Sequence, residues 1–261
     1  MSVRILAIDA GNTRIKWGID DGSVGHDVHA GQGWSQRGAL NTADIAGSHV
    51  FSDLLKASVV DCVVVSNVAG SQVAAAIKDQ IYSSRKPITF VSAQAAQCGV
   101  VNHYENPAQL GSDRWAALVA AHARAAGAPR AQLVVMAGTA LTVDALTADG
   151  HFLGGIIVPG MMLMHHALHR GTAQLPSASG EYQTFPTATA NSIASGAVEA
   201  CAGAVARMYT HLSTQVGVAP HCIGSGGAMQ ALASHLPFPV VINDNLVLDG
   251  IKVITEASAA A

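Results

Sequence analysis

The sequence of 261 residues is long enough for one large domain or two small ones. Half of its residues are hydrophobic, 12% are charged and the net charge is −3, so it can build a sizeable core. It contains no run of Lys and Arg, which excludes the usual surfaces that bind nucleic acid or an anionic membrane. No apolar run is long enough to span a membrane and the four cysteines form no CxxC pair, so we expect a cytoplasmic protein with reduced thiols.

The first half begins with a strand, a turn and a second strand. An apolar run over 3–9 leads into the turn Gly11-Asn12-Thr13, and alternation of apolar and polar residues resumes over 15–19. The turn is not a P-loop, because neither a helix nor Gly-Lys-Ser/Thr follows it. The elements expected next are a strand near 26–31, a helix over 41–56, a strand over 61–66, a helix over 71–84, a strand over 87–92, irregular chain over 93–110 and a helix over 111–126.

The same order restarts after a linker at 127–129. We expect strands over 133–136, 141–146 and 152–158, a helix over 161–170, a loop over 171–188, a helix over 192–212, a strand over 221–223, a helix from 228, a strand over 240–242 and a short terminal helix. The turns at Gly11 and Gly138 lie 127 residues apart, close to half the chain. The sequence therefore predicts an α/β fold of two duplicated halves, 1–127 and 128–261, with a ligand in the cleft between them.

Asp9 ends the first strand, directly before the first turn. A carboxylate at this place can hold hydrated Mg²⁺, while the backbone N–H groups of the turn at Gly11 and the side chains of Asn12 and Thr13 can cradle phosphate oxygens. Lys16 lies on the polar face of the returning strand, from which it can reach a terminal phosphate. The alternative is an ordinary hairpin with a capping Asp.

The stretch "GSDRWAALVAAHARA" opens the last helix of the first half. Gly111 or Ser112 begins the helix, so Asp113 and Arg114 lie in its first turn, where the helix dipole stabilises a carboxylate. Asp113 can accept the proton of an attacking alcohol, as the base in phosphoryl transfer does, and Arg114 offers a fork for a carboxylate or phosphate. The alternative is that Asp113 only favours the start of the helix.

Two further turns lie in the second half. Gly138-Thr139 is expected to face the first turn across the cleft, and Gly226-Gly227, between a strand and a helix, permits close approach of a flat ring or a ribose. Two histidines, His165 and His169, have the i, i+4 spacing of metal ligands. No HExxH glutamate accompanies them, which favours packing over metal binding.

Five motifs in this order, "DAGNTRIK", "YENPAQLGSDRWAA", "AGTALTVD", "GGIIVPG" and "GSGGA", together resemble those of the type III pantothenate kinases. That family belongs to the superfamily of acetate and sugar kinases, Hsp70 and actin, so the resemblance implies two ribonuclease H-like (actin-like ATPase) domains. It implies ATP-dependent phosphorylation of the primary hydroxyl of pantothenate, the first step of coenzyme A synthesis. It also implies ATP with Mg²⁺ and a homodimer in which the second subunit completes the substrate pocket.

The resemblance also assigns roles to residues of this chain. It implies binding of ATP phosphates and Mg²⁺ by the segment from Asp9 to Lys16, a general base at Asp113, an ATP contact at Thr139, and pantothenate contacts at Tyr104, at Gly111, Ser112 and Arg114, and at Thr189.

The chain departs from the family at Met136, where members usually have an acid associated with K⁺ or NH₄⁺. A thioether is a weak acceptor and cannot replace hard oxygen ligands. We therefore expect the monovalent cation site implied by the family to be absent or altered here.

Two other functions remain compatible with the sequence. One is a related kinase for another small alcohol or carboxylate, against which the stretches "YENP" and "GSDR" argue. The other is a nucleotide-binding regulatory or accessory factor without catalysis. The presence of Asp9, Lys16 and Asp113 favours catalysis over that alternative.

Overall fold

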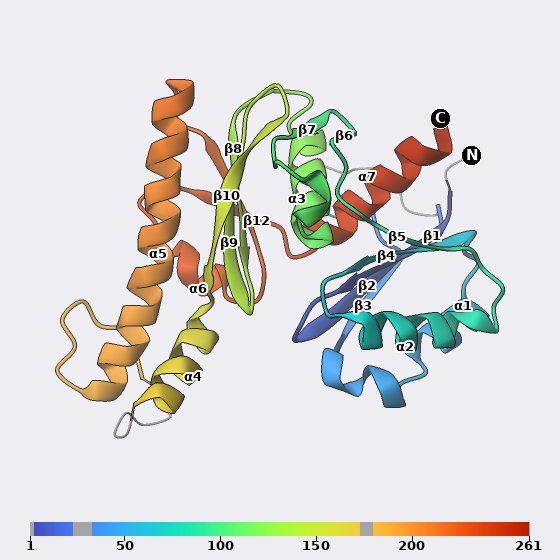
Figure 1. Cartoon of the computed structure of the whole chain (residues 1–261), viewed down its shortest axis with the longest axis horizontal. Coiled ribbons are helices and arrows are strands. Elements are labelled where there is room, and N and C mark those ends of the chain that lie inside the picture. Colours follow the sequence, from blue (N-terminus) through green and yellow to red (C-terminus); the bar gives the residue numbers. More distant parts are fainter. Residues whose placement is uncertain (1–2, 23–32, 173–179, 261) are drawn as a thin grey trace. The chain divides into compact units, whose positions relative to one another are not determined.

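The computed structural model describes residues 3–22, 33–172 and 180–260 (Figure 1). They form two compact units, one of Met1–Pro129 with Asn245–Ala261 and one of Arg130–Asp244. Among the described residues no helix is both long and apolar enough to cross a membrane. The strand expected near 26–31 lies outside the described residues.

The first unit contains a five-stranded sheet in the order β3-β2-β1-β4-β5. The strands are β1 (Ile5–Ala10), β2 (Arg14–Asp20), β3 (Gln36–Asn41), β4 (Cys62–Asn67) and β5 (Ile88–Phe90). β1 pairs antiparallel with β2, and β2 with β3, whereas β4 pairs parallel with both β1 and β5. The predicted opening of two strands around a turn is confirmed.

Helices cover both faces of this sheet (Figure 1). One face carries a 3₁₀ helix (Thr42–Gly47), α1 (Val50–Ala57) and α2 (Ser71–Tyr82), which bury Leu6, Ile8 and Val65. The other face carries α3 (Ser112–Arg124) and α7 (Leu246–Ala260). These two helices pack so closely that a Cβ at Gly250 would overlap the backbone of Ala116. Since strand side chains alternate between faces, Asp9 is on the α3 side of the sheet.

Several expected elements of this unit are corrected by the structure. The helix expected over 41–56 is split into the 3₁₀ helix and α1, which are separated at Ser48 and His49. The expected irregular stretch 93–110 contains β6 (Ala96–Gln97), β7 (Val100–Asn102) and a 3₁₀ turn (Pro107–Gln109). Elements of two or three residues are too short to produce a periodic pattern.

The second unit repeats the pairing pattern of the first. Its five strands run in the order β12-β11-β8-β9-β10. β9 pairs antiparallel with β8 and β10, and β11 pairs parallel with β8 and β12. The strands are β8 (Gln132–Ala137), β9 (Ala140–Leu146), β10 (His151–Pro159), β11 (His221–Ser225) and β12 (Val240–Ile242). The predicted duplication is therefore present at the level of strand topology.

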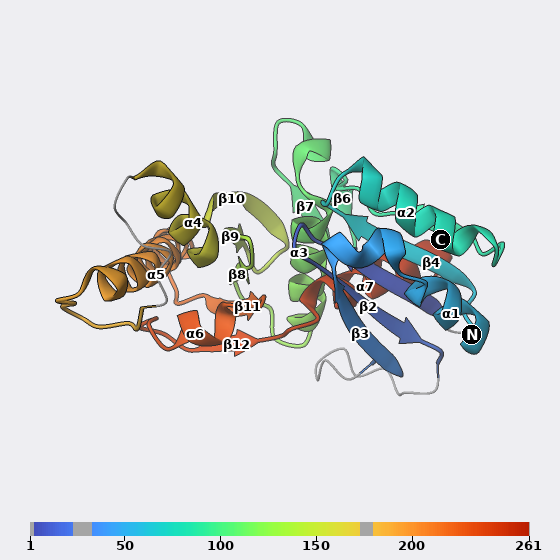
Figure 2. The same cartoon turned by 90° about the horizontal axis from the view of Figure 1, so that it is seen from below.

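Three helices accompany the second sheet: α4 (Met161–Gly171), α5 (Thr189–Val216) and α6 (Met229–Ala233). Figure 2 shows α5 beside this sheet with α4 next to it, and the core contains Leu133 and Val135 of β8 and Val205 of α5. The expected division gave the C-terminal residues to the second half. In the structure 245–261 pack with the first unit instead, because α7 lies against α3 and β1.

Candidate active site

Three polar side chains form a row across the first sheet. Asp9 in β1 lies opposite Lys16 in β2 and opposite Ser66 in β4, so their side chains lie on the same face. Asp9 and Lys16 are partly exposed, whereas Ser66 is fully buried. The row places one carboxylate between an ammonium and a hydroxyl at the end of the strands.

The turn after Asp9 is closed and braced by backbone hydrogen bonds. The N–H of Gly11 donates to the carbonyl of Arg14 at 3.1 Å. Thr42, at the start of the 3₁₀ helix, donates from its hydroxyl to the carbonyl of Gly11 at 2.7 Å and from its N–H to the carbonyl of Thr13 at 3.0 Å. Asn12 and Thr13 are exposed at the tip of this braced turn, as a phosphate-binding role requires.

Asp113 lies in the first turn of α3, as expected. Gly111 is the N-cap residue, and the N–H of Arg114 donates to Oδ1 of Asp113 at 2.8 Å. The preceding residue, Ser112, is buried and its hydroxyl lies 2.9 Å from that of Ser66. Ser112 was expected to line the substrate pocket, whereas its described partner is a strand residue of the same unit.

The pKa values of both Asp9 and Asp113 are raised. Burial raises the pKa of Asp9 to about 7, the negative charge of Asp113 adds to this rise, and Lys16 opposes it. Burial also raises the pKa of Asp113, which the backbone hydrogen bond from Arg114 and the Arg114 charge partly offset. Two carboxylates that repel each other near one lysine fit a divalent cation, whose charge removes the repulsion.

Tyr104 and Arg114 form a polar pair beside this helix start. Arg114 is 5% exposed and donates from Nη1 to the Tyr104 hydroxyl at 3.0 Å, with its guanidinium 5.8 Å from the centre of the Tyr104 ring. Asn102 orders the loop that carries Tyr104, because its Oδ1 accepts from the Tyr104 N–H at 3.0 Å. The structure thus joins two residues that the sequence placed in one pocket.

In the second unit, the Gly138-Thr139 turn is exposed and fixed by close backbone contacts. The N–H of Gly138 donates to the carbonyl of Ala140 at 3.0 Å, and that of Gly160 to the carbonyl of Thr139 at 2.9 Å. A Cβ at Gly160 would overlap the carbonyls of both turn residues. Gly160 belongs to the "GGIIVPG" motif, whose role in supporting this turn is visible only in three dimensions.

The "GSGG" loop packs against the same turn. Gly226 has φ +105°, and a Cβ there would lie 2.3 Å from the carbonyl oxygen of Ala137. That carbonyl also accepts from the N–H of Ala228 at 3.1 Å. Gly227 is exposed and has open space around it, which suits the expected approach of a ligand. The two glycines therefore have different tasks, one in packing and one at the surface.

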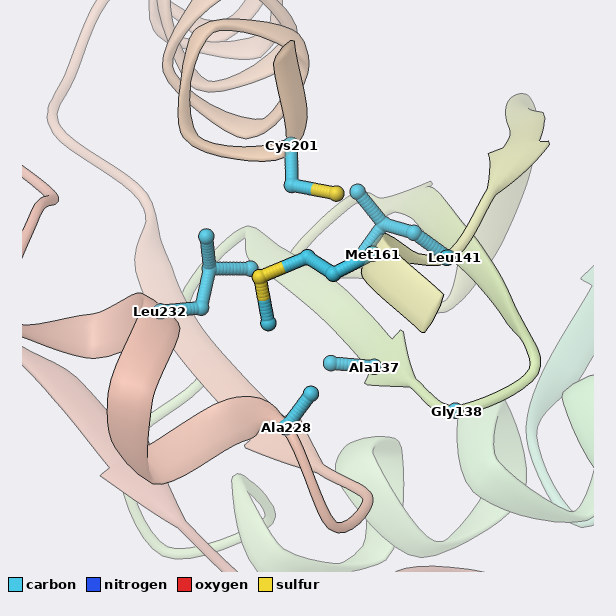
Figure 3. A pocket seen from close by; sticks show the side chains of 8 residues that line it. Ala137, Gly138, Leu141, Met161, Cys201, Ala228 and Leu232 are labelled. Atoms are coloured by element: carbon cyan, nitrogen blue, oxygen red, sulfur yellow. The ribbon is translucent and has the colours of Figure 1, made fainter. Parts of the chain in front are cut away.

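A small apolar cavity lies beneath this turn (Figure 3). The cavity is so small that it has room for a single water molecule at most. Figure 3 shows the sulfur-bearing side chains of Cys201 and Met161 at its wall. Its lining consists of Ala137, Gly138, Leu141, Gly160, Met161, Cys201, Ala228 and Leu232. Burial raises the pKa of the Cys201 thiol, so this cysteine stays protonated and unreactive at neutral pH.

A row equivalent to the first one crosses the second sheet. Met136 in β8 lies opposite Thr142 in β9 and opposite Ser225 in β11. Thr142 and Ser225 are buried, and the Thr142 hydroxyl has no hydrogen-bond partner among the described residues. This row contains no carboxylate.

The sites expected from the sequence are divided between the units. The first unit contains Asp9, Gly11, Asn12, Thr13, Lys16, Tyr104, Gly111, Ser112, Asp113 and Arg114, and the second contains Gly138, Thr139, Thr189, Gly226 and Gly227. Thr189 is exposed as the first residue of α5. Within the described chain, no three His, Cys, Asp or Glu residues are grouped so that they could hold a metal ion.

Sequence reasoning missed Ser66, Thr42 and Asn102. Ser66 follows the apolar run "VVV" at the end of a strand, and a polar residue at that place was the only available signal.

Comparison with known proteins connects this geometry to a family. The family model described as type III pantothenate kinase matches residues 5–211. The chain belongs to the type III pantothenate kinase family. Proteins named type III pantothenate kinase from Nitrosospira multiformis and Aromatoleum aromaticum are 42% and 45% identical to it. The alignments cover 99% and 98% of this chain and 94% and 100% of those proteins. Family membership makes the chain a kinase.

Solved structures show the same fold at low sequence identity. A Campylobacter jejuni protein described as a candidate Baf family transcriptional activator is 18% identical, with a TM-score of 0.59 over 98% of this chain and 100% of its own. A candidate 2-dehydro-3-deoxygalactonokinase from Sinorhizobium meliloti is 15% identical, with a TM-score of 0.58 over 97% and 99%. These likenesses support the duplicated actin-like architecture predicted for the chain.

Proposed function

We propose that this chain transfers the γ-phosphoryl group of ATP to the primary hydroxyl of pantothenate, giving 4'-phosphopantothenate and ADP for coenzyme A synthesis. The observation that carries the proposal is the placement of Asp113 in the first turn of α3, where its charge acts on Asp9 beside Lys16. The relatives named type III pantothenate kinase support the choice of substrate.

In this proposal different residues of the first unit accept the proton, bind the phosphates and bind Mg²⁺. Asp113 takes the proton from the pantothenate hydroxyl as its oxygen bonds to the γ-phosphorus and the bond to the β–γ bridging oxygen of ATP breaks. Lys16 and the exposed residues Asn12 and Thr13 of the turn after Asp9 hold the phosphates in line for this attack. Asp9 would hold Mg²⁺, directly or through water, and the ion would neutralise charge on the phosphates.

The other site residues position the two substrates. Tyr104 and Arg114 would receive the pantothenate carboxylate as a hydrogen-bonding pair, since the guanidinium is already oriented by the Tyr104 hydroxyl. Thr139 and the turn around Gly138 would contact ATP, and Gly226 and Gly227 would lie along its nucleoside. Thr189 would contact pantothenate.

A substrate panel tests the proposed function. ADP release is measured with pantothenate, sugars and acetate, and Asp113→Asn serves as the control variant. We expect ADP release only with pantothenate, and a kcat about 100- to 10,000-fold lower in the variant, which is the usual contribution of a general base. A sugar or acetate as the preferred acceptor would identify a related kinase. Nucleotide binding with no acceptor at all would identify an accessory factor.

We propose further that no carboxylate-held monovalent cation supports the second turn. The family site needs hard oxygen ligands, but here Met136 lies between the Thr142 and Ser225 hydroxyls, and the Thr142 hydroxyl is buried without a described partner. The residues present do not fit K⁺ or NH₄⁺ as the family acid does. Activity in KCl should match activity in choline chloride at equal ionic strength, and a saturable K⁺ requirement would contradict this.

We also propose that the chain acts as a homodimer in the cytoplasm. Consecutive elements of the second unit expose large apolar side chains, with Ile157 of β10 61% exposed, Met162 of α4 64% exposed and Phe185 88% exposed. A surface of this kind is more often covered by a partner than left in water. The four free thiols support a reducing compartment. Light scattering of the purified chain should give twice the 26.6 kDa chain mass, and a monomer that turns over at full rate would contradict the dimer.

A further inference from the structure

A buried pair of hydroxyls connects the first sheet to the helix that carries the proposed base. The hydroxyl oxygens of Ser66 and Ser112 lie 2.9 Å apart, although the residues are 46 positions apart in the sequence. Ser66 is 0% exposed and Ser112 is 8% exposed, so neither hydroxyl has ready access to water. Loss of one hydroxyl would leave the other buried without its partner, which is costly.

Each of the two serines is next to a carboxylate of the candidate site. Ser66 lies directly opposite Asp9 in the pairing of β4 with β1. Ser112 immediately precedes Asp113 in the chain. The bond therefore joins the strand next to Asp9 to the helical turn that carries Asp113.

Arg114 and Trp115 bond to Tyr104 and Gln97, but the start of α3 has no side-chain cap. Its N-cap residue, Gly111, has no side chain and makes no side-chain cap hydrogen bond. A Cβ at Gly111 would lie 2.6 Å from Oδ1 of Asp113, so the Asp113 side chain folds back over the cap. A helix start without a side-chain cap frays readily unless another contact fixes it. The Ser66–Ser112 bond is a contact of that kind.

We propose that Ser66 and Ser112 are positioning residues whose mutual hydrogen bond holds Asp113 at the distance from Asp9 that phosphoryl transfer requires. This inference rests on the proposed function for its effect on turnover. Its effect on the two carboxylates does not depend on which acceptor the enzyme uses.

Removal of either serine hydroxyl should misplace Asp113 without removing a group that binds ATP. The two hydroxyls bond each other and neither is assigned to ATP, so Ser66→Ala and Ser112→Ala should bind ATP within about threefold of the wild type. A misplacement of about 1 Å can cost up to ~100-fold in rate, and we expect kcat to fall at least ~10-fold in each variant. Because the two hydroxyls act as one unit, the double variant should be no slower than the slower single variant.

A matched control separates positioning from general stability. Ser84 accepts from the N–H of Lys86 at 3.2 Å and donates to the carbonyl of Ile81 at 2.6 Å. It precedes the N-terminal end of β5, whereas Ser66 lies at the C-terminal end of β4, so the two serines are at opposite edges of the sheet. Ser84→Ala should lower the melting temperature and leave kcat unchanged.

The test combines kinetics with a readout that needs no turnover. In protein without ATP, hydrogen exchange follows the N–H of Trp115, which donates to the carbonyl of Gly111 at 2.9 Å at the start of α3. In Ser66→Ala and Ser112→Ala this exchange should be faster, because the first turn of the helix is no longer fixed to β4. In Ser84→Ala it should match the wild type.

The outcomes distinguish this inference from the function on which it rests. A lower kcat, an unchanged KM for ATP and faster exchange of the Trp115 N–H in both serine variants would support the positioning role. A lower melting temperature with kcat and this exchange both unchanged would overturn it. If the wild type does not phosphorylate pantothenate, the proposed function fails, while hydrogen exchange still decides whether the serines fix the first turn of α3. If Ser66→Ala does not fold, Ser112→Ala alone decides the question.

Discussion

The two sheets carry the same row of three positions with different chemistry. In the first unit the row is Lys16, Asp9 and Ser66, and in the second it is Thr142, Met136 and Ser225. Both rows end with a serine on the parallel neighbour strand. The middle and antiparallel positions are charged in one row and uncharged in the other. Duplication thus preserved the strand topology while the ionic groups remained on one side only.

The difference shows how a repeated fold separates two tasks. A row with a carboxylate and an ammonium can hold a cation and a phosphate, whereas a row of a thioether and two hydroxyls can mainly shape a turn. Close backbone packing by Gly160 and Gly226 gives the second turn its form without charge. The first turn would then perform chemistry and the second would support the nucleotide.

The largest expected effect comes from neutralising Asp9, the middle residue of the first row, and the matched control replaces Met136, the middle residue of the second row. Asp9→Asn should lower kcat roughly 100- to 1,000-fold, the scale found when one electrostatic stabiliser of a transition state is removed. Met136→Leu keeps an apolar side chain of similar size, so kcat should stay within threefold. Steady-state ADP release measures both. An equal fall in kcat in the two variants would contradict the claim that only the first row takes part in the chemistry.

The packing of the second turn should respond to a change at only one of two adjacent glycines. Gly226→Ala places a Cβ on a residue with φ +105° and against the carbonyl of Ala137, and it should cost about 1–3 kcal/mol of unfolding free energy. Gly227→Ala is the matched control, since open space surrounds Gly227 and its stability should hardly change. Urea unfolding of both variants measures this. An unaffected Gly226→Ala would refute the packing role.

The raised pKa of Asp9 should make the stability of the protein depend on pH. A carboxyl whose folded pKa is about 7 contributes stability that is present below its ordinary pKa of 3.8 and is lost as pH rises toward 7. Asp9→Asn carries no such charge, so its melting temperature relative to the wild type should rise from pH 4.5 to pH 8. A difference that stays constant across this range would show that Asp9 ionises normally.

The smallest effect is expected from restoring an acid in the second row. Met136→Asp places a carboxylate between the Thr142 and Ser225 hydroxyls, which together supply hard oxygen ligands. The variant should gain a K⁺ response of a few-fold in kcat/KM that the wild type lacks. Titration with KCl against choline chloride measures it. A strong K⁺ requirement in the wild type would show that other oxygens hold the ion.

Much of this architecture could be predicted from the sequence, because most strands are apolar runs followed by turn residues. The third strand was expected near 26–31, outside the described residues, and the strand at Gln36–Asn41 was not predicted. β3 has the sequence "QRGALN" and lies at the edge of the sheet with its side chains largely exposed, so it has no apolar alternation. The terminal helix was expected to be short, but it spans 15 residues and packs on the first unit. Its partners α3 and β1 lie more than 120 residues earlier in the chain and leave no local signal in its sequence.

In the candidate site, too, contacts between distant segments could not be predicted from the sequence. Asp9, Lys16 and Asp113 could be found because their residue types and spacing suit phosphoryl transfer. Ser66 could not, since a hydroxyl at the end of an apolar strand has meaning only once Ser112 lies against it. Charge is visible in a sequence, whereas a hydrogen bond between distant segments is not.

Detection of the product itself tests the central claim most directly. Purified protein is incubated with ATP, Mg²⁺ and pantothenate, and ³¹P NMR follows the phosphate resonances, with Asp113→Asn in parallel. We predict that a phosphomonoester resonance of 4'-phosphopantothenate appears in proportion to ADP and is nearly absent with the variant. Equal formation of this product by Asp113→Asn, or ADP without any phosphomonoester, would contradict the account.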